Sequence, residues 1–96
     1  MYGTIARMRV KSGMEDRLVA LSNNQAANPA PGQVATYVYR MDSNPNEFFL
    51  VVMFESREAY RANAESPEQH QSYLEYMQFM DGEPEWHDGE IVWSSQ

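Results

Sequence analysis

Two polar side chains, His70 and Asn63, are the strongest candidates for chemistry in this chain of 96 residues. An imidazole beside a pocket can act as a general base near neutral pH. An asparagine amide can hold a substrate carbonyl or a developing oxyanion. A structural interpretation stays open for each: His70 as a hydrogen-bonded histidine of the core or helix edge, and Asn63 as a helix-end side chain bonded to nearby backbone.

Aromatic and thioether side chains predict the walls of a pocket for a small ligand near these two residues. The candidates for substrate binding are Tyr37, Phe49, Tyr60, Tyr73, Met77 and Trp86. Trp86 is also suited to anchor over the mouth of the pocket or against a second subunit. The same residue types fill ordinary hydrophobic cores, so their spacing alone does not separate the two roles.

Acidic residues cluster around the second histidine, near the end of the chain. This run contains Asp81, Glu83, Glu85, His87, Asp88 and Glu90. Its spacing matches no calcium-binding loop, and it is typical of a solvated acidic segment rather than of a metal site. Glycine-rich nucleotide motifs and hydrolase motifs are missing from the sequence. We therefore expect neither a metal nor an organic cofactor.

Composition argues against several classes of partner. The formal net charge is −7, and such a surface repels the phosphate backbone of a nucleic acid. No basic amphipathic segment favours a membrane surface, and the longest apolar run, Phe48 to Phe54, is too short to span a bilayer. Cysteine is absent and no signal peptide is recognisable, so we expect a cytoplasmic protein.

The elements that must position the candidate residues alternate along the chain. Residues 2–10 predict a strand, and Ser12 with Glu15 predicts the capping box of a following amphipathic helix. Residues 33–41 and 47–55 predict two further strands. The short polar segment between them predicts an antiparallel hairpin.

The second half of the chain predicts two successive helices and a last strand. Ser56 is expected to cap a helix that reaches about Glu65, and Ser66 with Pro67 is expected to begin the next helix. The inward stripe of this next helix is expected to be His70, Tyr73, Leu74, Met77 and Met80. The last strand is expected over residues 90–94.

This order of elements predicts one α+β domain over residues 1–96, with the ferredoxin-like βαββαβ plan. Right-handed crossovers around the hairpin give a four-stranded antiparallel sheet with helices on one face. The strand that contains Phe48 to Phe54 is apolar at every position, whereas a sheet covered on one face needs only alternation. A second copy of the chain on the other face explains this, so we expect a homodimer formed through the sheet. The alternative is a central strand whose far face is partly exposed.

Three segments make the chain similar to the antibiotic biosynthesis monooxygenase family of dimeric α/β barrels. They are residues 10–13 before the first helix, residues 54–60 from a strand into the second helix, and the pair Ser66-Pro67 before the helix that carries His70. The resemblance implies cofactor-independent oxygenation of phenols to quinones, in a pocket between the sheet and the helices of each subunit.

One branch of this family degrades haem. At the positions of that branch's functional residues this chain carries Ala6, Asn63 and Tyr73, so we do not expect haem degradation. Two alternatives to the oxygenase stay open. The dimer could bind a small apolar or aromatic ligand without catalysis, or it could be an isomerase or lyase of the same barrel type that uses one general base without oxygen.

Overall fold

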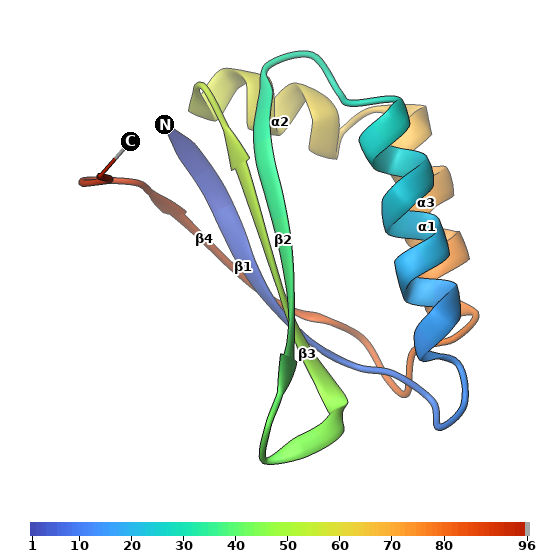
Figure 1. Ribbon diagram of the computed structural model, residues 1–96. Coiled ribbons are helices and arrows are strands. Elements are labelled where there is room, and N and C mark those ends of the chain that lie inside the picture. Colours follow the sequence, from blue (N-terminus) through green and yellow to red (C-terminus); the bar gives the residue numbers. More distant parts are fainter. Residues whose placement is uncertain (96) are drawn as a thin grey trace.

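A computed structural model of the chain describes residues 1–95. Its elements are β1 (Tyr2–Arg9), α1 (Glu15–Ala27), β2 (Gln33–Met41), β3 (Asn44–Phe54), α2 (Arg57–Ala64), α3 (Pro67–Met77) and β4 (Glu85–Glu90). The strands form one antiparallel sheet in the order β2-β3-β1-β4. The helices lie on one side of it, with α1 and α3 side by side and α2 across one end (Figure 1). The expected ferredoxin-like plan is confirmed.

The caps of α2 and α3 are the predicted ones. The side-chain oxygen of Ser56 accepts a hydrogen bond from the backbone N–H of Ala59 at 3.1 Å, and that of Ser66 accepts one from Gln69 at 3.1 Å. Each cap satisfies a backbone donor that the first turn of the helix leaves without a partner. Pro67 follows Ser66 in the first turn, where its missing N–H costs nothing.

The predicted cap of α1 is wrong. The residue before this helix is Met14, which makes no side-chain cap, and Ser12 lies two residues further back. Gly13 has a φ of +81°, a left-handed conformation that favours glycine and turns the chain between Ser12 and the helix. The Ser12 hydroxyl instead accepts a hydrogen bond from the Asn46 side chain at 3.3 Å.

The predicted inward stripe of α3 is wrong in part. Tyr76 is the buried residue of this helix, whereas Leu74 is 46% exposed and His70 is also exposed. Tyr73 and Met77 are partly buried on either side of Tyr76. Met80 is buried, but it lies beyond the end of α3, where it bridges to Val10. The sheet-facing side of α3 is therefore centred on Tyr76.

The last strand also lies elsewhere than predicted. β4 covers Glu85–Glu90, the acidic run, and the apolar residues after it are outside any strand. This strand is at the edge of the sheet, where charged side chains are common because they discourage pairing with other chains. Val92 and Trp93, in the segment after β4, are 86% and 79% exposed.

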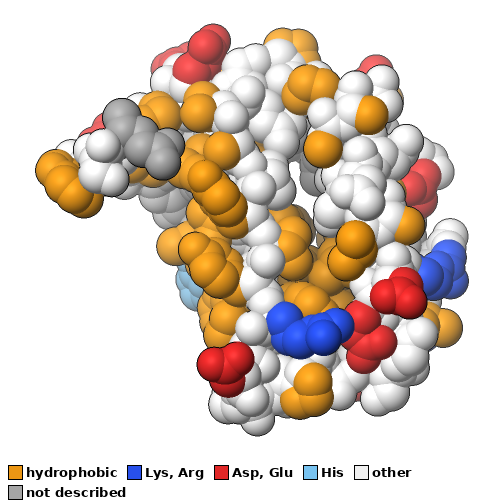
Figure 2. Space-filling view, viewed as in Figure 1, with side chains coloured by type: hydrophobic (Ala, Val, Ile, Leu, Met, Phe, Trp, Pro, Cys, Tyr) orange, Lys and Arg blue, Asp and Glu red, His pale blue; other side chains and the backbone are white. Residues whose placement is uncertain are grey.

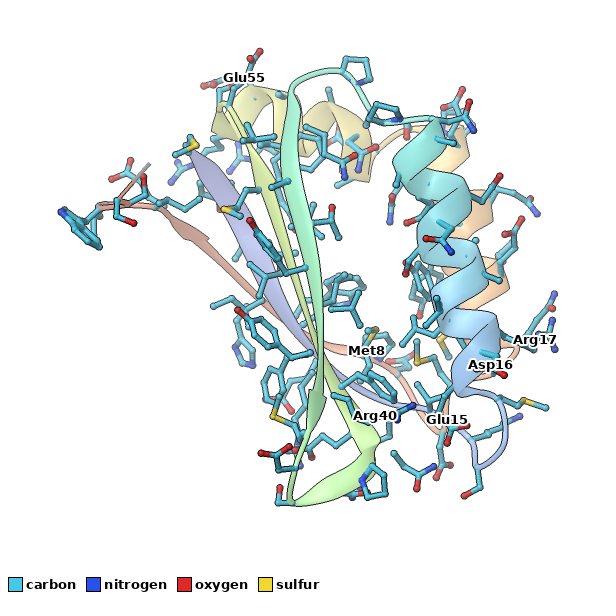
Figure 3. The ribbon with its side chains drawn as sticks, in the orientation of Figure 1. Met8, Glu15, Asp16, Arg17, Arg40 and Glu55 are labelled. Carbon is cyan, nitrogen blue, oxygen red and sulfur yellow. The ribbon has the colours of Figure 1, made fainter. Side chains whose placement is uncertain are left out.

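The hydrophobic core lies where the lower parts of α1 and α3 meet the sheet, close to Met8 in Figure 3. It consists of Ala6, Met8, Val10, Leu18, Phe48, Leu50, Tyr76, Phe79 and Met80. The antiparallel register decides which side chains face the helices. Residues of even number in β1 and β3 do so, and residues of odd number face the open side of the sheet. Among residues 1–95, no helix has the length and apolar character that crossing a membrane requires.

Candidate functional site

A cavity of about 860 Å³ lies between the sheet and the helices. This is within the range of roughly 300–1,000 Å³ that is usual for small-molecule sites. Figure 2 shows it as a hollow between β2 and the helices, with apolar side chains inside. Five of the predicted site residues line this cavity. Trp86 comes from β4, and the other four come from α2 and α3: Tyr60, Asn63, His70 and Tyr73.

The floor of the cavity is a row of side chains across the sheet. Thr36, Val52, Thr4 and Asp88 are consecutive partners in the strand register, and all four line the cavity. The adjacent row continues the floor with Leu50 and Trp86. The floor therefore combines apolar side chains with the polar side chains of Thr36, Thr4 and Asp88.

Tyr60 and Asp88 form a hydrogen-bonded pair at this edge. The phenol of Tyr60 donates to Asp88 Oδ1 at 2.7 Å. Its ring packs against Tyr2 and Phe54, with centroid distances of 5.3 and 5.6 Å. Burial, and then the hydrogen bond to Asp88, raise the pKa of Tyr60 to about 12. The phenol is therefore neutral throughout the physiological pH range.

Thr4 stands beside this pair and is only 4% exposed. Its hydroxyl is near enough to the Tyr60 oxygen to oppose the rise in the pKa of Tyr60, but it makes no hydrogen bond of good geometry with the residues described. Buried hydroxyls usually have a partner, because an unsatisfied one loses its hydrogen bonds to water. Thr4 is therefore an open polar position on the cavity wall.

Asn63 lies where α2 ends and α3 begins. Its side-chain amide donates to Oε1 of the Gln69 side chain at 3.3 Å, and its backbone carbonyl oxygen accepts from the Ser66 hydroxyl at 2.7 Å. The hydrogen bond of the Asn63 side chain therefore goes to another side chain and not, as the structural interpretation expected, to nearby backbone. The amide still lines the cavity together with Gln69, so the same contacts that hold it also orient it toward a ligand.

His70 lies in the first half of α3, and its side chain is exposed. It belongs to the cavity wall together with Tyr73. The described residues give it no hydrogen bond to Asn63 or to a tyrosine hydroxyl. His70 and Asn63 therefore line one cavity without a hydrogen bond between them among the residues described.

Tyr76 closes the cavity between α1 and α3. Its hydroxyl donates to Gln25 Oε1 at 3.1 Å, which ties the two helices together. Burial raises the pKa of Tyr76, so this phenol is also a neutral donor.

Three predicted substrate-binding residues do not line the cavity. Tyr37 and Phe49 lie on the open side of the sheet, because their register partners Val51 and Arg7 face away from the helices. Met77 packs against the hydrophobic core instead. An apolar strand does not reveal from its composition which of its faces borders a cavity, and this accounts for the misplacement of Tyr37 and Phe49.

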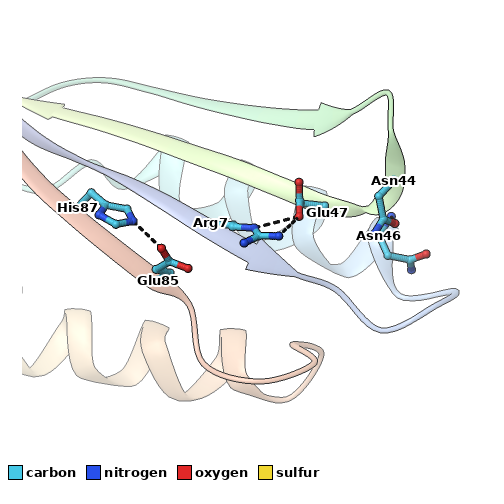
Figure 4. A network of polar contacts seen from close by, with 6 residues as sticks. All are labelled: Arg7, Asn44, Asn46, Glu47, Glu85 and His87. Carbon is cyan, nitrogen blue, oxygen red and sulfur yellow. Dashed lines mark hydrogen bonds and ion pairs between the residues drawn. The ribbon is translucent and has the colours of Figure 1, made fainter.

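The alternation of β4 divides the acidic run between the two faces of the sheet. Asp88 and Trp86 line the cavity, whereas Glu85 and His87 lie on the open side, where they contact each other at 2.9 Å. Figure 4 shows this contact near the ion pair between Arg7 and Glu47. Within residues 1–95, no three histidine, cysteine, aspartate or glutamate side chains are placed to hold a metal ion.

Thr4, Gln25 and Asp88 are polar residues of the cavity that the sequence did not single out as site residues. The alternation of β1 could have indicated Thr4, because it lies on the same face of the strand as the buried residues Ala6 and Met8. Asp88 could not be found in this way, because the acidic run did not predict a strand.

The family model of antibiotic biosynthesis monooxygenases matches residues 1–73. No curated protein sequence matches the chain.

Solved structures share the fold at low sequence identity. SnoaB, a cofactor-independent oxygenase from Streptomyces nogalater, matches in a mutant form with a TM-score of 0.81 and 14% identity, over 98% of this chain and 95% of SnoaB. A provisionally named antibiotic biosynthesis monooxygenase from Chloroflexus aurantiacus gives 0.79 and 22%, over 99% of this chain and 96% of that one. A conserved protein from Methanosarcina mazei gives 0.79 and 14%, over 92% and 89%. At these identities the likeness concerns the fold alone.

Proposed function

Because the chain belongs to the antibiotic biosynthesis monooxygenase family, we propose that it is a cofactor-independent monooxygenase that acts on a small aromatic substrate of the phenol or quinone type. The observation that carries this proposal is the cavity, whose floor offers the apolar side chains of Val52, Leu50 and Trp86 to a flat ring and whose wall holds His70 and Asn63. The likeness to the fold of SnoaB, an oxygenase that needs no cofactor, supports the same reaction class.

The proposed reaction needs no reductant other than the substrate. His70 accepts the phenolic proton, and the resulting phenolate is electron-rich at a ring carbon that meets dioxygen. One oxygen atom forms the new carbonyl of the quinone. The O–O bond breaks, and the other oxygen leaves as water with two hydrogens from the substrate. The Asn63 amide donates to the oxygen on which negative charge develops.

Oxygen uptake tests this mechanism. His70→Ala and Asn63→Ala should each lower turnover of an accepted naphthol or hydroquinone by roughly 100-fold, the usual effect of removing a general base or an oxyanion donor. The measurement is the rate of oxygen consumption by metal-free protein, together with the quinone absorbance. Gln71→Ala is the matched control, since Gln71 is an exposed neighbour of His70 outside the cavity wall. Unchanged turnover in both cavity variants would show the mechanism to be wrong.

A second candidate function is ligand binding without catalysis. It is favoured by the absence of a hydrogen bond between His70 and Asn63 among the residues described, where a prepared catalytic pair often has one. Binding of a phenol with no uptake of oxygen would support this function. An isomerase or lyase would differ from both because it would convert its substrate under anaerobic conditions.

We also propose that two chains pair through the open side of the sheet. Ile5, Tyr37 and Tyr39 are 49%, 49% and 54% exposed there, next to the apolar side chains of β3. An apolar surface of this extent on a single chain is typical of a subunit interface.

A further inference from the structure

The buried hydroxyl of Thr4 faces the cavity without a hydrogen-bond partner of good geometry among residues 1–95. Thr4 is 4% exposed, and its neighbours in the register, Val52 and Asp88, line the same wall. A valine has nearly the same shape and would remove the cost of leaving a hydroxyl unsatisfied. A buried hydroxyl at this position therefore indicates that a polar atom of a bound molecule forms the missing hydrogen bond with Thr4.

The neighbours of Thr4 limit what that atom can be. The hydroxyl hydrogen of Tyr60 is already donated to Asp88, with 2.7 Å between the oxygens, so the Tyr60 oxygen and the Asp88 carboxylate are left as hydrogen-bond acceptors. Thr4 offers a donor and an acceptor. A ligand hydroxyl fits, because it accepts from Thr4 and donates to Asp88 or to the Tyr60 oxygen. An ether oxygen can only accept, and a carboxylate can only accept and also carries charge.

The charges around the cavity reinforce this selection. The residues that line it within the described part of the chain include two acids, Asp88 and Glu68, and neither lysine nor arginine. An anionic ligand next to Asp88 would meet repulsion from its carboxylate and no counter-charge among these lining residues.

We propose that Thr4, Tyr60 and Asp88 form the recognition point for a hydroxyl group on a neutral aromatic ligand, and that this point makes the cavity reject anionic aromatics. The inference rests on the proposed function in one respect, namely that the cavity takes a small aromatic molecule. It adds which residues select a neutral molecule at the binding step, before any proton is transferred to His70.

Equilibrium dialysis with three matched probes tests the proposal: 2-naphthol, its methyl ether and 2-naphthoate, at neutral pH. We expect the unmodified protein to bind 2-naphthol roughly three- to tenfold more tightly than the ether, the usual effect of one net hydrogen bond. Naphthoate should bind more weakly than either. Equal affinities for naphthol and ether, tighter binding of naphthoate, or no binding of any probe would overturn the proposal.

Two variants of Thr4 test whether its hydroxyl causes the preference for naphthol over the methyl ether. Thr4→Val keeps the shape and loses the hydroxyl, so it should abolish the preference for naphthol over the ether and leave affinity for the ether unchanged. Thr4→Ser keeps the hydroxyl and should keep the preference. If Thr4→Val retains the full preference, the ligand hydroxyl forms its hydrogen bond with water and not with Thr4, and the proposal is wrong. Thermal unfolding shows whether each variant is folded, and Thr4→Val should be at least as stable as the unmodified protein.

Asp88→Asn tests the rejection of anions. It should raise the affinity for naphthoate several-fold relative to the methyl ether, and an unchanged ratio would contradict the role of Asp88. These binding measurements are independent of oxygen uptake. A protein that prefers naphthol through Thr4 but consumes no oxygen would refute the monooxygenase alone. Turnover of naphthols with no effect of Thr4→Val on binding would refute the recognition point alone.

Discussion

Tyr60 shows how one residue can be held in a single protonation state by its surroundings. Its ring packs against Tyr2 and Phe54, and its hydroxyl donates a hydrogen bond to Asp88. Burial and the nearby carboxylate both disfavour the phenolate. Tyr60 can therefore orient a ligand as a neutral group, but it is poorly suited to act as a base.

This environment predicts a late titration of Tyr60. Its pKa is about 12 in the folded protein against an ordinary value of 10.0. Since the folded pKa is the higher one, its contribution to stability is fully present below pH 10 and is lost as the pH rises through 12. The difference in tyrosinate absorbance between the unmodified protein and Tyr60→Phe measures this step.

Asp88→Asn should lower the pKa of Tyr60 only in part, because burial is the larger cause. In the unfolded protein the same step should return to the ordinary value, which serves as the control. A step near pH 10 in the folded protein would contradict the environment described.

Among the elements, the junction of α2 and α3 does most to shape the site. Ser66 accepts from the Gln69 N–H at 3.1 Å and donates to the Asn63 carbonyl at 2.7 Å, so one hydroxyl joins the end of one helix to the start of the next. The geometry of Asn63, Gln69 and His70 depends on this serine. The motif of serine and proline predicted the junction from the sequence, because caps are local features that neighbouring residues decide.

Two of the three predicted serine caps, Ser66 and Ser12, lead to different expectations in mutants. Ser66→Ala should lower the free energy of unfolding by about 1–2 kcal/mol, because it removes a cap and a second hydrogen bond. Ser12→Ala should change it by less than about 0.5 kcal/mol, because Ser12 is exposed and caps no helix. Urea denaturation with unchanged m-values measures both effects. Equal losses in the two variants would contradict the different roles of these serines.

The elements whose position or phase the sequence predicted wrongly depend on contacts with residues far away along the chain. Residues 85–90 carry mostly polar side chains and form a strand only because β1 offers them an edge. The phase of α3 is set by Tyr76, whose ring packs on Phe79 at 5.9 Å and whose hydroxyl reaches Gln25 on α1. Helical spacing alone could not show this, because the helix has apolar side chains in more than one direction.

At the scale of the whole molecule, the sheet has one covered face and one apolar open face. The odd-numbered residues of β3 point to the open side, together with Ile5 and Tyr37. The sequence predicted that this strand needs cover on both faces, since no alternation was visible. It could not predict which residues point which way, because that depends on the register, and so it did not show that Tyr37 and Phe49 lie on the open side.

The proposed dimer can be tested at one position. Val51 faces the open side, between Ile5 and Tyr37 in the register, so Val51→Asp should split the dimer and leave the monomer folded. Sedimentation velocity gives the mass, which should be twice that of one chain before the substitution.

Val19→Asp is the matched control, since Val19 is 53% exposed on α1, away from the sheet, and the dimer should persist. A stable monomer of the unmodified protein would contradict the pairing.

The hydrophobic core and the cavity occupy different ends of the same sheet. Among the residues described, the core cluster and the cavity wall share only Leu50 and Tyr76. Replacing the exposed polar residues of the wall therefore removes little of the packing that keeps the chain folded, whereas Phe54, also on the wall, is only 1% exposed and contributes to that packing. During evolution, proteins with this arrangement can exchange the polar residues around the cavity and so change their ligand specificity, while the fold stays intact.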